Sequence, residues 1–194
     1  MIRLVALGSL AVLSLSACNQ PPEPASAPAT ATPAAEVPAT DALTALGYGP
    51  LRIGMTRAEV EAALGPDADP NSVGGPDPDS CDMFRPARAP EGLMVMVENG
   101  ILTSVWLRQN TNVATDRAVR IGDLAAEVKQ VYGTDAEVRP HEYVDAPAEY
   151  ITVWSTPDHQ SAGARGVTYE VGEDGRVQSI AAGGPSIQYV EGCA

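Results

Sequence analysis

An internal repeat constrains this chain more than any other feature of its sequence. Residues 52–65 (RIGMTRAEVEAALG) align with residues 120–133 (RIGDLAAEVKQVYG) at an offset of 68, and seven of the fourteen aligned positions are identical. Self-similarity at a fixed offset is typical of folds in which one supersecondary unit occurs more than once. The sequence therefore predicts two related units, which we assign to residues 43–115 and 116–194.

Each copy carries the start and stop signals of a short helix. Thr56 and Glu59 have the spacing of a capping box, and Asp123 is placed to cap the second helix. Gly65 and Gly133 stand where a helix end favours a left-handed residue. Both copies carry an apolar stripe with helical spacing: Val60, Ala63 and Leu64 in the first, and Val128, Val131 and Tyr132 in the second.

A predicted hairpin follows each helix. Residues 93–97 and 101–107 flank Asn99-Gly100, and residues 167–171 and 176–182 flank Asp174-Gly175 at an offset of 75. Such dipeptides favour tight hairpin turns, which need positive φ angles. Further strands are expected at 150–154 and 187–190, and a loop at 66–82. We expect an α+β fold, a tandem repeat of short helices followed by antiparallel strands, with the helices packed on one face of a continuous curved antiparallel sheet.

Alternation along the strands predicts which face is buried. In the second hairpin, Val167, Tyr169 and Val171 share one face with Ile180 and Ala182, so this face is assigned to the core. Transferring the assignment at an offset of 75 places Met94, Met96 and Val105 in the core. The opposite, open face then carries Leu93, Val95, Val97, Leu102 and Trp106, joined by Tyr150, Thr152 and Trp154.

An exposed apolar and aromatic face of this kind commonly marks an interface with another macromolecule. We therefore treat it as the candidate binding face. The alternative is a register that differs by one residue, in which case Trp106 and Trp154 are ordinary core residues.

The first residues indicate export. Arg3 precedes an apolar run, residues 4–15, that is too short to span a bilayer. The run ends in Leu15-Ser16-Ala17-Cys18, which resembles the lipobox of bacterial lipoproteins. The resemblance implies that residues 1–17 are a signal peptide and that lipid on Cys18 anchors the chain to a membrane. Asn19, rather than Asp, after that Cys implies the outer membrane, facing the periplasm; an ordinary secretory signal is the alternative.

Residues 18–42 follow as a tether. Six Pro and seven Ala among residues 19–40 leave too little apolar surface to offset the entropy of ordering.

Two cysteines, Cys81 and Cys193, remain after the lipid anchor. In an oxidising compartment we expect them to pair, and a disulfide that closes so long a loop stabilises by about 5 kcal/mol in the chain-entropy model. Two free thiols, or a link between two molecules, are the alternatives.

Composition excludes some classes of function. The chain has 25 acidic and 12 basic residues, a formal net charge of -13, and no basic cluster, which argues against a nucleic-acid partner. The acidic residues Asp67, Asp69, Asp77, Asp79 and Asp82 crowd one loop. They lack the glycine and terminal glutamate of a calcium-binding EF-hand loop, so we expect a solvated loop rather than a cation site.

Motifs for catalysis and metal binding are missing from the sequence as well. His141 and His159 have no partners at zinc-site spacing, and no nucleophile motif is present. We therefore expect no metal, no cofactor and no enzymatic activity. A periplasmic hydrolase that uses one of these histidines with an aspartate is the enzymatic alternative.

The pattern Ile-Gly-Met-Thr, a short helix with Glu-Val and Leu-Gly, then an antiparallel sheet, all repeated in tandem, resembles the β-lactamase inhibitory protein fold and the SmpA/OmlA outer-membrane lipoproteins. The resemblance covers most of residues 43–194. It implies a protein that binds another envelope protein with a concave sheet surface, either as an assembly accessory or as an enzyme inhibitor. Recognition of a glycan or cell-wall ligand by the aromatic face is the alternative function.

Overall fold

The computed structural model describes residues 41–72 and 74–193. The predicted signal peptide, the Cys18 anchor and the tether up to residue 40 lie outside the described residues. The described part is an α+β fold with a large antiparallel sheet and two short α-helices. None of its helices has the length and apolar character needed to cross a membrane.

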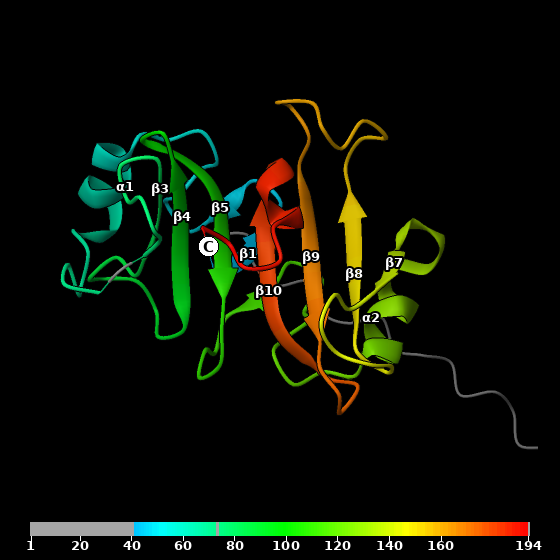
Figure 1. Ribbon diagram of the computed structural model, residues 1–194. Helices are drawn as coiled ribbons and strands as arrows, with labels where there is room; N and C mark the ends of the chain where they lie inside the picture. The colour runs from blue at the N-terminus through cyan, green and yellow to red at the C-terminus, as the bar shows by residue number, and fades with distance from the viewer. Residues whose placement is uncertain (1–40, 73, 194) are drawn as a thin grey trace, which may run out of the picture. The chain divides into compact units, whose positions relative to one another are not determined.

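Seven antiparallel strands form the large sheet in the order β3-β4-β5-β10-β9-β8-β7 (Figure 1). The strands are β3 (Cys81–Phe84), β4 (Leu93–Glu98), β5 (Ile101–Leu107), β7 (Glu137–Pro140), β8 (Glu149–Trp154), β9 (Gly166–Val171) and β10 (Val177–Gly183). A small sheet contains β1 (Ala42–Thr44), β2 (Gly47–Tyr48) and β6 (Ala114–Thr115). Because β5 pairs with β10, the last strands of the two meanders meet inside the large sheet.

The two α-helices, α1 (Arg57–Leu64) and α2 (Ala125–Tyr132), occupy the predicted positions. The capping box of α1 is present: Glu59 N–H donates to Thr56 Oγ1 at 3.3 Å, and Thr56 N–H donates to Glu59 Oε2 at 2.8 Å. The predicted cap of α2 is wrong, because its N-cap is Leu124 and the Asp123 carboxylate accepts from Arg120 N–H instead.

Each helix start is bonded to the hairpin that follows it by backbone hydrogen bonds at equivalent positions. In the first half they are Gly54 N–H to Leu102 O, Leu102 N–H to Met55 O and Arg57 N–H to Gly100 O, at 2.7–2.8 Å. In the second half they are Gly122 N–H to Val177 O, Val177 N–H to Asp123 O and Ala125 N–H to Gly175 O, at 2.8–3.0 Å. Equivalent residues at the two helix starts are 68 positions apart in the chain, and equivalent residues in the two hairpins are 75 positions apart. These are the two offsets at which the sequences align.

The main core lies on one face of the large sheet. Val60 of α1 and Val128 of α2 belong to the same apolar cluster as Leu43 and Leu51. The sheet contributes Leu93, Val95, Val97, Leu102, Val105, Leu107, Ile151, Val167, Tyr169, Val171, Val177, Ile180 and Ala182. The predicted inner face of the second hairpin is thus the face that the sheet buries in this core.

The predicted faces of the first hairpin are wrong on β4. Leu93, Val95 and Val97 are buried in the main core, as is Leu102, whereas Met96 belongs to a separate cluster on the opposite face with Met94 packed against it. Val105 lies in the main core as expected.

A difference in turn length explains the error on β4, and the extra residue Thr103 in β5 explains the error at Leu102. Residues 98–101 separate the paired residues Val97 and Leu102, and Asn99 (φ 49°) and Gly100 (φ 77°) form the predicted two-residue turn. Residues 172–176 separate the paired residues Val171 and Val177, so the second turn is one residue longer. β5 and β10 therefore match at an offset of 75 but β4 and β9 match at 74, and a shift of one residue exchanges the faces of a strand.

Two segments differ from the expected elements. Residues 187–190 do not form a strand, because Pro185 begins a 3-10 helix, η2 (Pro185–Gln188), there. The expected loop at 66–82 ends earlier, since Cys81 and Asp82 belong to β3. A second short 3-10 helix, η1 (Gly133–Asp135), continues directly from α2.

Candidate functional site

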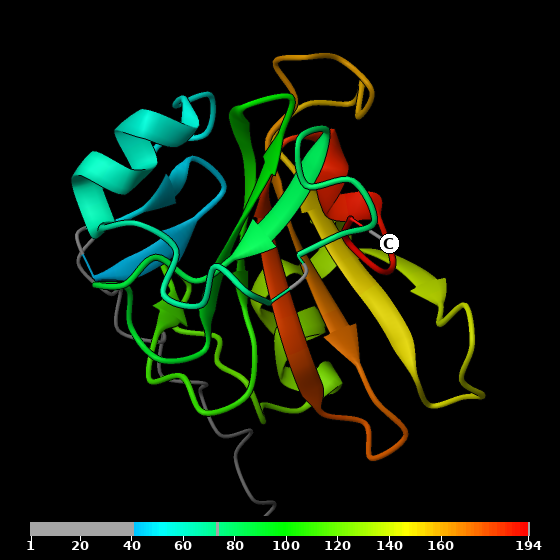
Figure 2. The same ribbon diagram turned by 60° about the vertical axis from the view of Figure 1, so that its left-hand side comes forward.

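The face of the large sheet that points away from the main core is the candidate site, and we call it the far face. Its residues are Met94, Met96, Trp106, Tyr150, Thr152, Trp154, Thr168, Glu170, Ser179 and Ala181. Residues 184–193, the C-terminal segment, run over its middle, where η2 contacts β5, β9 and β10. Figure 2 shows this segment in red on the side of the sheet away from the blue strands β1 and β2.

A second apolar cluster holds the C-terminal segment in place. Met96, Trp106 and Ala181 of the sheet pack with Ile187 and Cys193 of the segment. The predicted disulfide between Cys81 and Cys193 is present, with the two Cα atoms 5.4 Å apart, and it ties the end of the segment to β3. The far face is therefore covered in part by the chain itself.

The predicted binding residues divide between the two faces of the sheet. Leu93, Val95, Val97 and Leu102 are core residues and are not available to a partner. Trp106, Tyr150 and Trp154 lie on the far face as expected, but Trp106 is only 3% exposed because the C-terminal segment covers it. Tyr150 is also buried, and Trp154 is half-buried. The described part of the sheet therefore lacks the open apolar surface expected from the sequence.

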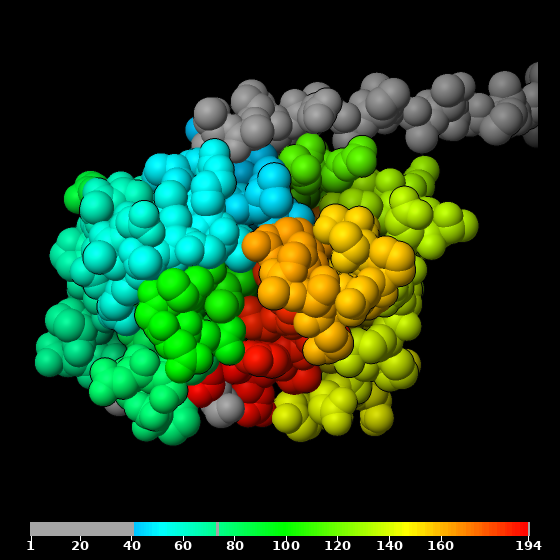
Figure 3. All heavy atoms as spheres, turned by 90° about the horizontal axis from the view of Figure 1, so that it is seen from above, coloured from blue at the N-terminus to red at the C-terminus, as the bar shows by residue number. Residues whose placement is uncertain are grey.

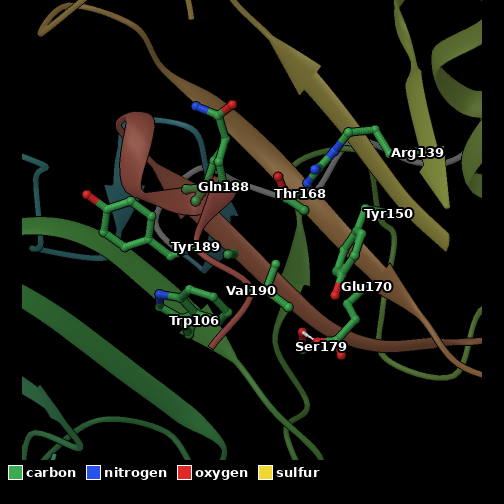
Figure 4. Close-up of a pocket in the computed structure, with 11 residues that line it drawn as sticks. Trp106, Arg139, Tyr150, Thr168, Glu170, Ser179, Gln188, Tyr189 and Val190 are labelled. Atoms are coloured by element: carbon green, nitrogen blue, oxygen red, sulfur yellow. Dashed lines mark hydrogen bonds between the residues drawn. The ribbon is translucent and has the colours of Figure 1, made fainter. Parts of the chain in front are cut away.

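A polar cluster occupies the β8–β10 side of the far face (Figure 4). Its centre is the Glu170 carboxylate, which accepts a hydrogen bond from the Ser179 hydroxyl and lies 3.3 Å from His141 Nε2. The ring of Tyr150 stacks on His141 with the centroids 4.7 Å apart, and the Arg139 guanidinium lies over Tyr150 at 5.2 Å. Sequence reasoning missed this cluster because its residues are distant in the chain and match no motif.

The order of contacts in this cluster is not that of a hydrolytic triad. The Ser179 hydroxyl donates a hydrogen bond to Glu170, whereas the serine nucleophile of a Ser–His–Asp triad donates to His. Arg108 Nη1 lies 3.8 Å from the same carboxylate. The arrangement therefore holds the Glu170 carboxylate between Ser179, His141 and Arg108 and differs from a Ser–His–carboxylate triad.

The second histidine is held in a similar way at the other end of β8. His159 stacks on Trp154 with the centroids 4.7 Å apart, and its Nε2 lies 3.3 Å from Glu137 Oε1. Each histidine thus stacks on one aromatic ring and lies beside one carboxylate. Within residues 41–72 and 74–193, no three His, Cys, Asp or Glu side chains are grouped so that they could hold a metal ion.

Three tyrosines near the C-terminal segment have a raised pKa. Burial, and then the charge of Glu170, raises the pKa of Tyr150. Hydrogen bonding to Glu191 raises the pKa of Tyr143, and the charge of Glu98 raises the pKa of Tyr189. Tyr143 is 67% exposed and Tyr189 is 47% exposed, although neither stands in a periodic pattern that could have identified it from the sequence.

The acidic segment before β3 has separate internal contacts. Asp82 is buried on β3 and pairs with Arg57 of α1, with Arg57 Nη1 2.6 Å from Asp82 Oδ2. In the loop, Asp77 accepts from the Ser80 hydroxyl and Asp67 accepts from Asp69 N–H. Asp82 therefore stabilises the packing of α1 against the sheet rather than belonging to the solvated loop.

Comparisons with known proteins assign no family. No protein-family model matches the chain, and no curated protein matches its sequence. Among solved structures, it is similar to a DUF4309 family protein, YjgB, from Bacillus subtilis subsp. subtilis str. 168, with 14% identity over 77% of this chain and 87% of that chain. The TM-score is 0.44, a similarity too low to support an inference about function.

Proposed function

We propose that this chain is a lipid-anchored periplasmic protein that binds another protein of the cell envelope with its far face. The observation that carries the proposal is the set of exposed or half-buried side chains around the C-terminal segment: Tyr143, Tyr189, Arg108 and Arg139. Tyrosine and arginine are enriched among the residues that contribute most to protein–protein binding. A rigid sheet closed by a disulfide orders them before a partner arrives, which lowers the entropic cost of binding.

The proposal includes a duplicated architecture with both helices on one face of the sheet. It is supported by the equivalent backbone hydrogen bonds at Gly54 and Gly122 and by the presence of Val60 and Val128 in one cluster. In that arrangement the helices cover the core side, and the far face is free for a partner except where residues 184–193 cover it.

The two edges of the large sheet favour binding by a face over binding by strand addition. On the β3 edge, the preceding loop already supplies partners, since Met83 N–H donates to Gly74 O at 3.1 Å. On the other edge, β7 ends at Pro140, which has no N–H to offer an added strand.

The anchor and its location remain proposals from residues 1–19: lipid on Cys18 and, because Asn19 follows it, the outer membrane. An assembly accessory and an enzyme inhibitor are both compatible with this surface. The glycan-binding alternative is less favoured because Trp106 and Tyr150 are buried. The hydrolase alternative, in which His141 or His159 acts with an aspartate, is less favoured because the carboxylates beside these histidines belong to Glu170 and Glu137.

Site-specific photocrosslinking in living cells tests the proposal. A p-benzoylphenylalanine residue at Tyr143 or Arg139 should capture one discrete envelope protein. The matched control is the same residue at Val131 of α2, which is also exposed but lies on a helix of the core side and should capture none. Capture from Val131 alone would contradict the proposal. A second variant, Cys18→Ser, should lose metabolically incorporated palmitate.

A further inference from the structure

A second concave surface lies at one end of the large sheet, apart from the polar cluster of the far face. It is bounded by the β4–β5 turn, the segment between β8 and β9 and the start of η2, and has a volume of about 330 Å³. Figure 3 looks onto this end, where the cyan, green, orange and red segments surround a hollow. We propose that this end groove binds a peptide segment of a partner protein through an apolar side chain that has a carboxylate beside it.

One wall of the end groove is apolar. Ile53, Ile101 and Pro185 line it, with the buried Leu102 beneath. Ile101 is 38% exposed, so a large branched side chain faces solvent beside an unfilled hollow. Because removing apolar surface from water is favourable, this wall favours binding of an apolar side chain of the partner.

The opposite wall presents a cation. Arg165 lines the groove, and its Nη1 donates to Ala162 O at 3.0 Å and to Ala164 O at 2.7 Å. These bonds orient the guanidinium but leave Nε and Nη2 available. Arg165 forms no ion pair with any residue in the described part of the chain. The planar guanidinium matches a carboxylate, which it can bind with two parallel hydrogen bonds.

The acid that lines the groove does not compete for Arg165. Glu98 forms no ion pair with Arg165 or with any other residue in the described part of the chain, and its charge raises the pKa of the neighbouring Tyr189. The whole chain carries a formal charge of -13, yet screening at physiological salt limits interactions between exposed charges to about 8 Å. The nearby guanidinium, rather than the net charge, therefore selects what binds in the groove.

An independent observation also indicates an occupant. Ser186 lines the groove, is 3% exposed, and its Oγ has no hydrogen-bond partner among residues 41–72 and 74–193. Buried polar atoms of proteins nearly always have a partner. Because this Oγ is shielded from solvent, the Ser186 side chain must turn toward the groove before a polar atom of a bound peptide, or a trapped water, can supply the missing hydrogen bond.

The carboxylate could come from the C-terminus of the partner or from an Asp or Glu side chain, and three fluorescein-labelled peptides distinguish these sources. The first ends in Ala-Leu with a free carboxylate, the second is the same peptide as a carboxamide, and the third contains Leu-Asp inside an amidated chain. Fluorescence anisotropy with the full chain should show binding of the first or the third, and binding of the second should be weaker by about tenfold or more.

Variants link this binding to the groove. Arg165→Gln should weaken the binding of the acidic peptide by about tenfold. Arg85→Gln, which removes an exposed arginine outside the groove, should leave the affinity for this peptide unchanged. Ile101→Ser should weaken the binding of all three peptides. Circular dichroism confirms that each variant is folded, and amide chemical-shift changes on peptide addition should map to residues 98–103 and 184–186.

Equal binding of the acid and the amide overturns the inference, and so does the absence of binding by all three peptides up to about 5 mM. The inference does not rest on the proposed function. If crosslinks persist from Tyr143 while every peptide fails to bind, the far-face proposal stands and the end groove is not a peptide site.

Discussion

The two hairpins of the large sheet follow helices of similar sequence but turn differently. β4–β5 turns through Asn99 and Gly100, whereas β9–β10 uses one residue more. After the turn the returning strands β5 and β10 have the same pairing pattern. Each carries a bulge at the equivalent position, Thr103 in β5 and Gln178 in β10. Turn length, rather than the apolar pattern of the strands, therefore decides which side chains of β4 enter the core.

The two halves also differ in what fills the space between helix and sheet. The hydroxyls of Tyr132 in α2 and Tyr169 in β9 form a hydrogen bond, with the two oxygens 2.6 Å apart. The equivalent positions in the first half are Leu64 and Val95, which are purely apolar. The second half thus contains a partly buried hydrogen bond where the first half has only apolar side chains.

The largest expected effect comes from separating the two halves at their covalent link. Replacing both cysteines, Cys81→Ser with Cys193→Ser, should lower the free energy of unfolding by about 5 kcal/mol, since the bond closes a loop with a sequence separation of 112. Urea denaturation under non-reducing conditions measures this. A reduced wild-type sample should match the variant, and equal stability of oxidised wild type and variant would contradict the prediction.

Neighbouring residues of β4 test the difference in register. Leu93→Ala should cost about 3 kcal/mol because it opens a cavity in the main core, whereas Met94→Ala, on the far face, should cost about 1 kcal/mol. Urea denaturation of both variants gives the comparison. A larger loss for Met94→Ala would mean that β4 presents the opposite face.

Substitutions in the two hairpin turns should change the stability of the protein by different amounts. Asn99→Ala should destabilise by about 1 kcal/mol because Asn99 has a φ of 49°, which alanine adopts poorly. Glu173→Ala, in the longer turn, should change stability by less than about 0.5 kcal/mol, because Glu173 is exposed and has no positive φ. Similar losses in thermal unfolding would refute the assigned difference between the turns.

The helix starts should give changes of opposite sign. Thr56→Ala removes the cap of α1 and should cost about 1 kcal/mol. Leu124→Thr supplies a hydroxyl at the α2 N-cap, which has none, and should raise stability by up to about 1 kcal/mol. If Leu124→Thr destabilises, the contacts of the Leu124 side chain matter more than the missing cap.

The smallest difference is expected at alkaline pH. Burial, and then the neighbouring Tyr132, raises the pKa of Tyr169 well above its ordinary value of 10.0. Because folding favours the protonated form, this contribution to stability is complete below pH 10 and is lost as the pH rises above it. Tyr169→Phe should therefore show a flatter loss of stability above pH 10, and an identical alkaline profile would count against the buried hydroxyl pair.

Local signals were sufficient for several elements. The capping box at Thr56, the glycines that end both helices and the dipeptides at Asn99 and Asp174 predicted helix and hairpin positions that the structure contains. The disulfide was predictable because two cysteines remain in a chain with an export signal. The short strands β1, β2, β3, β6 and β7 were not, since strands of so few residues carry no readable alternation.

Sequence alone determined the α+β class and the cysteine pair, because these follow from local propensity and from counting residues. Only the tertiary structure decided which side of β4 is buried and that residues 184–193 cover Trp106. Strand register depends on turn geometry, and burial depends on contacts between segments far apart in the chain. The cluster around Glu170 and the end groove beside Arg165 arise from those distant contacts, so no local pattern could indicate them.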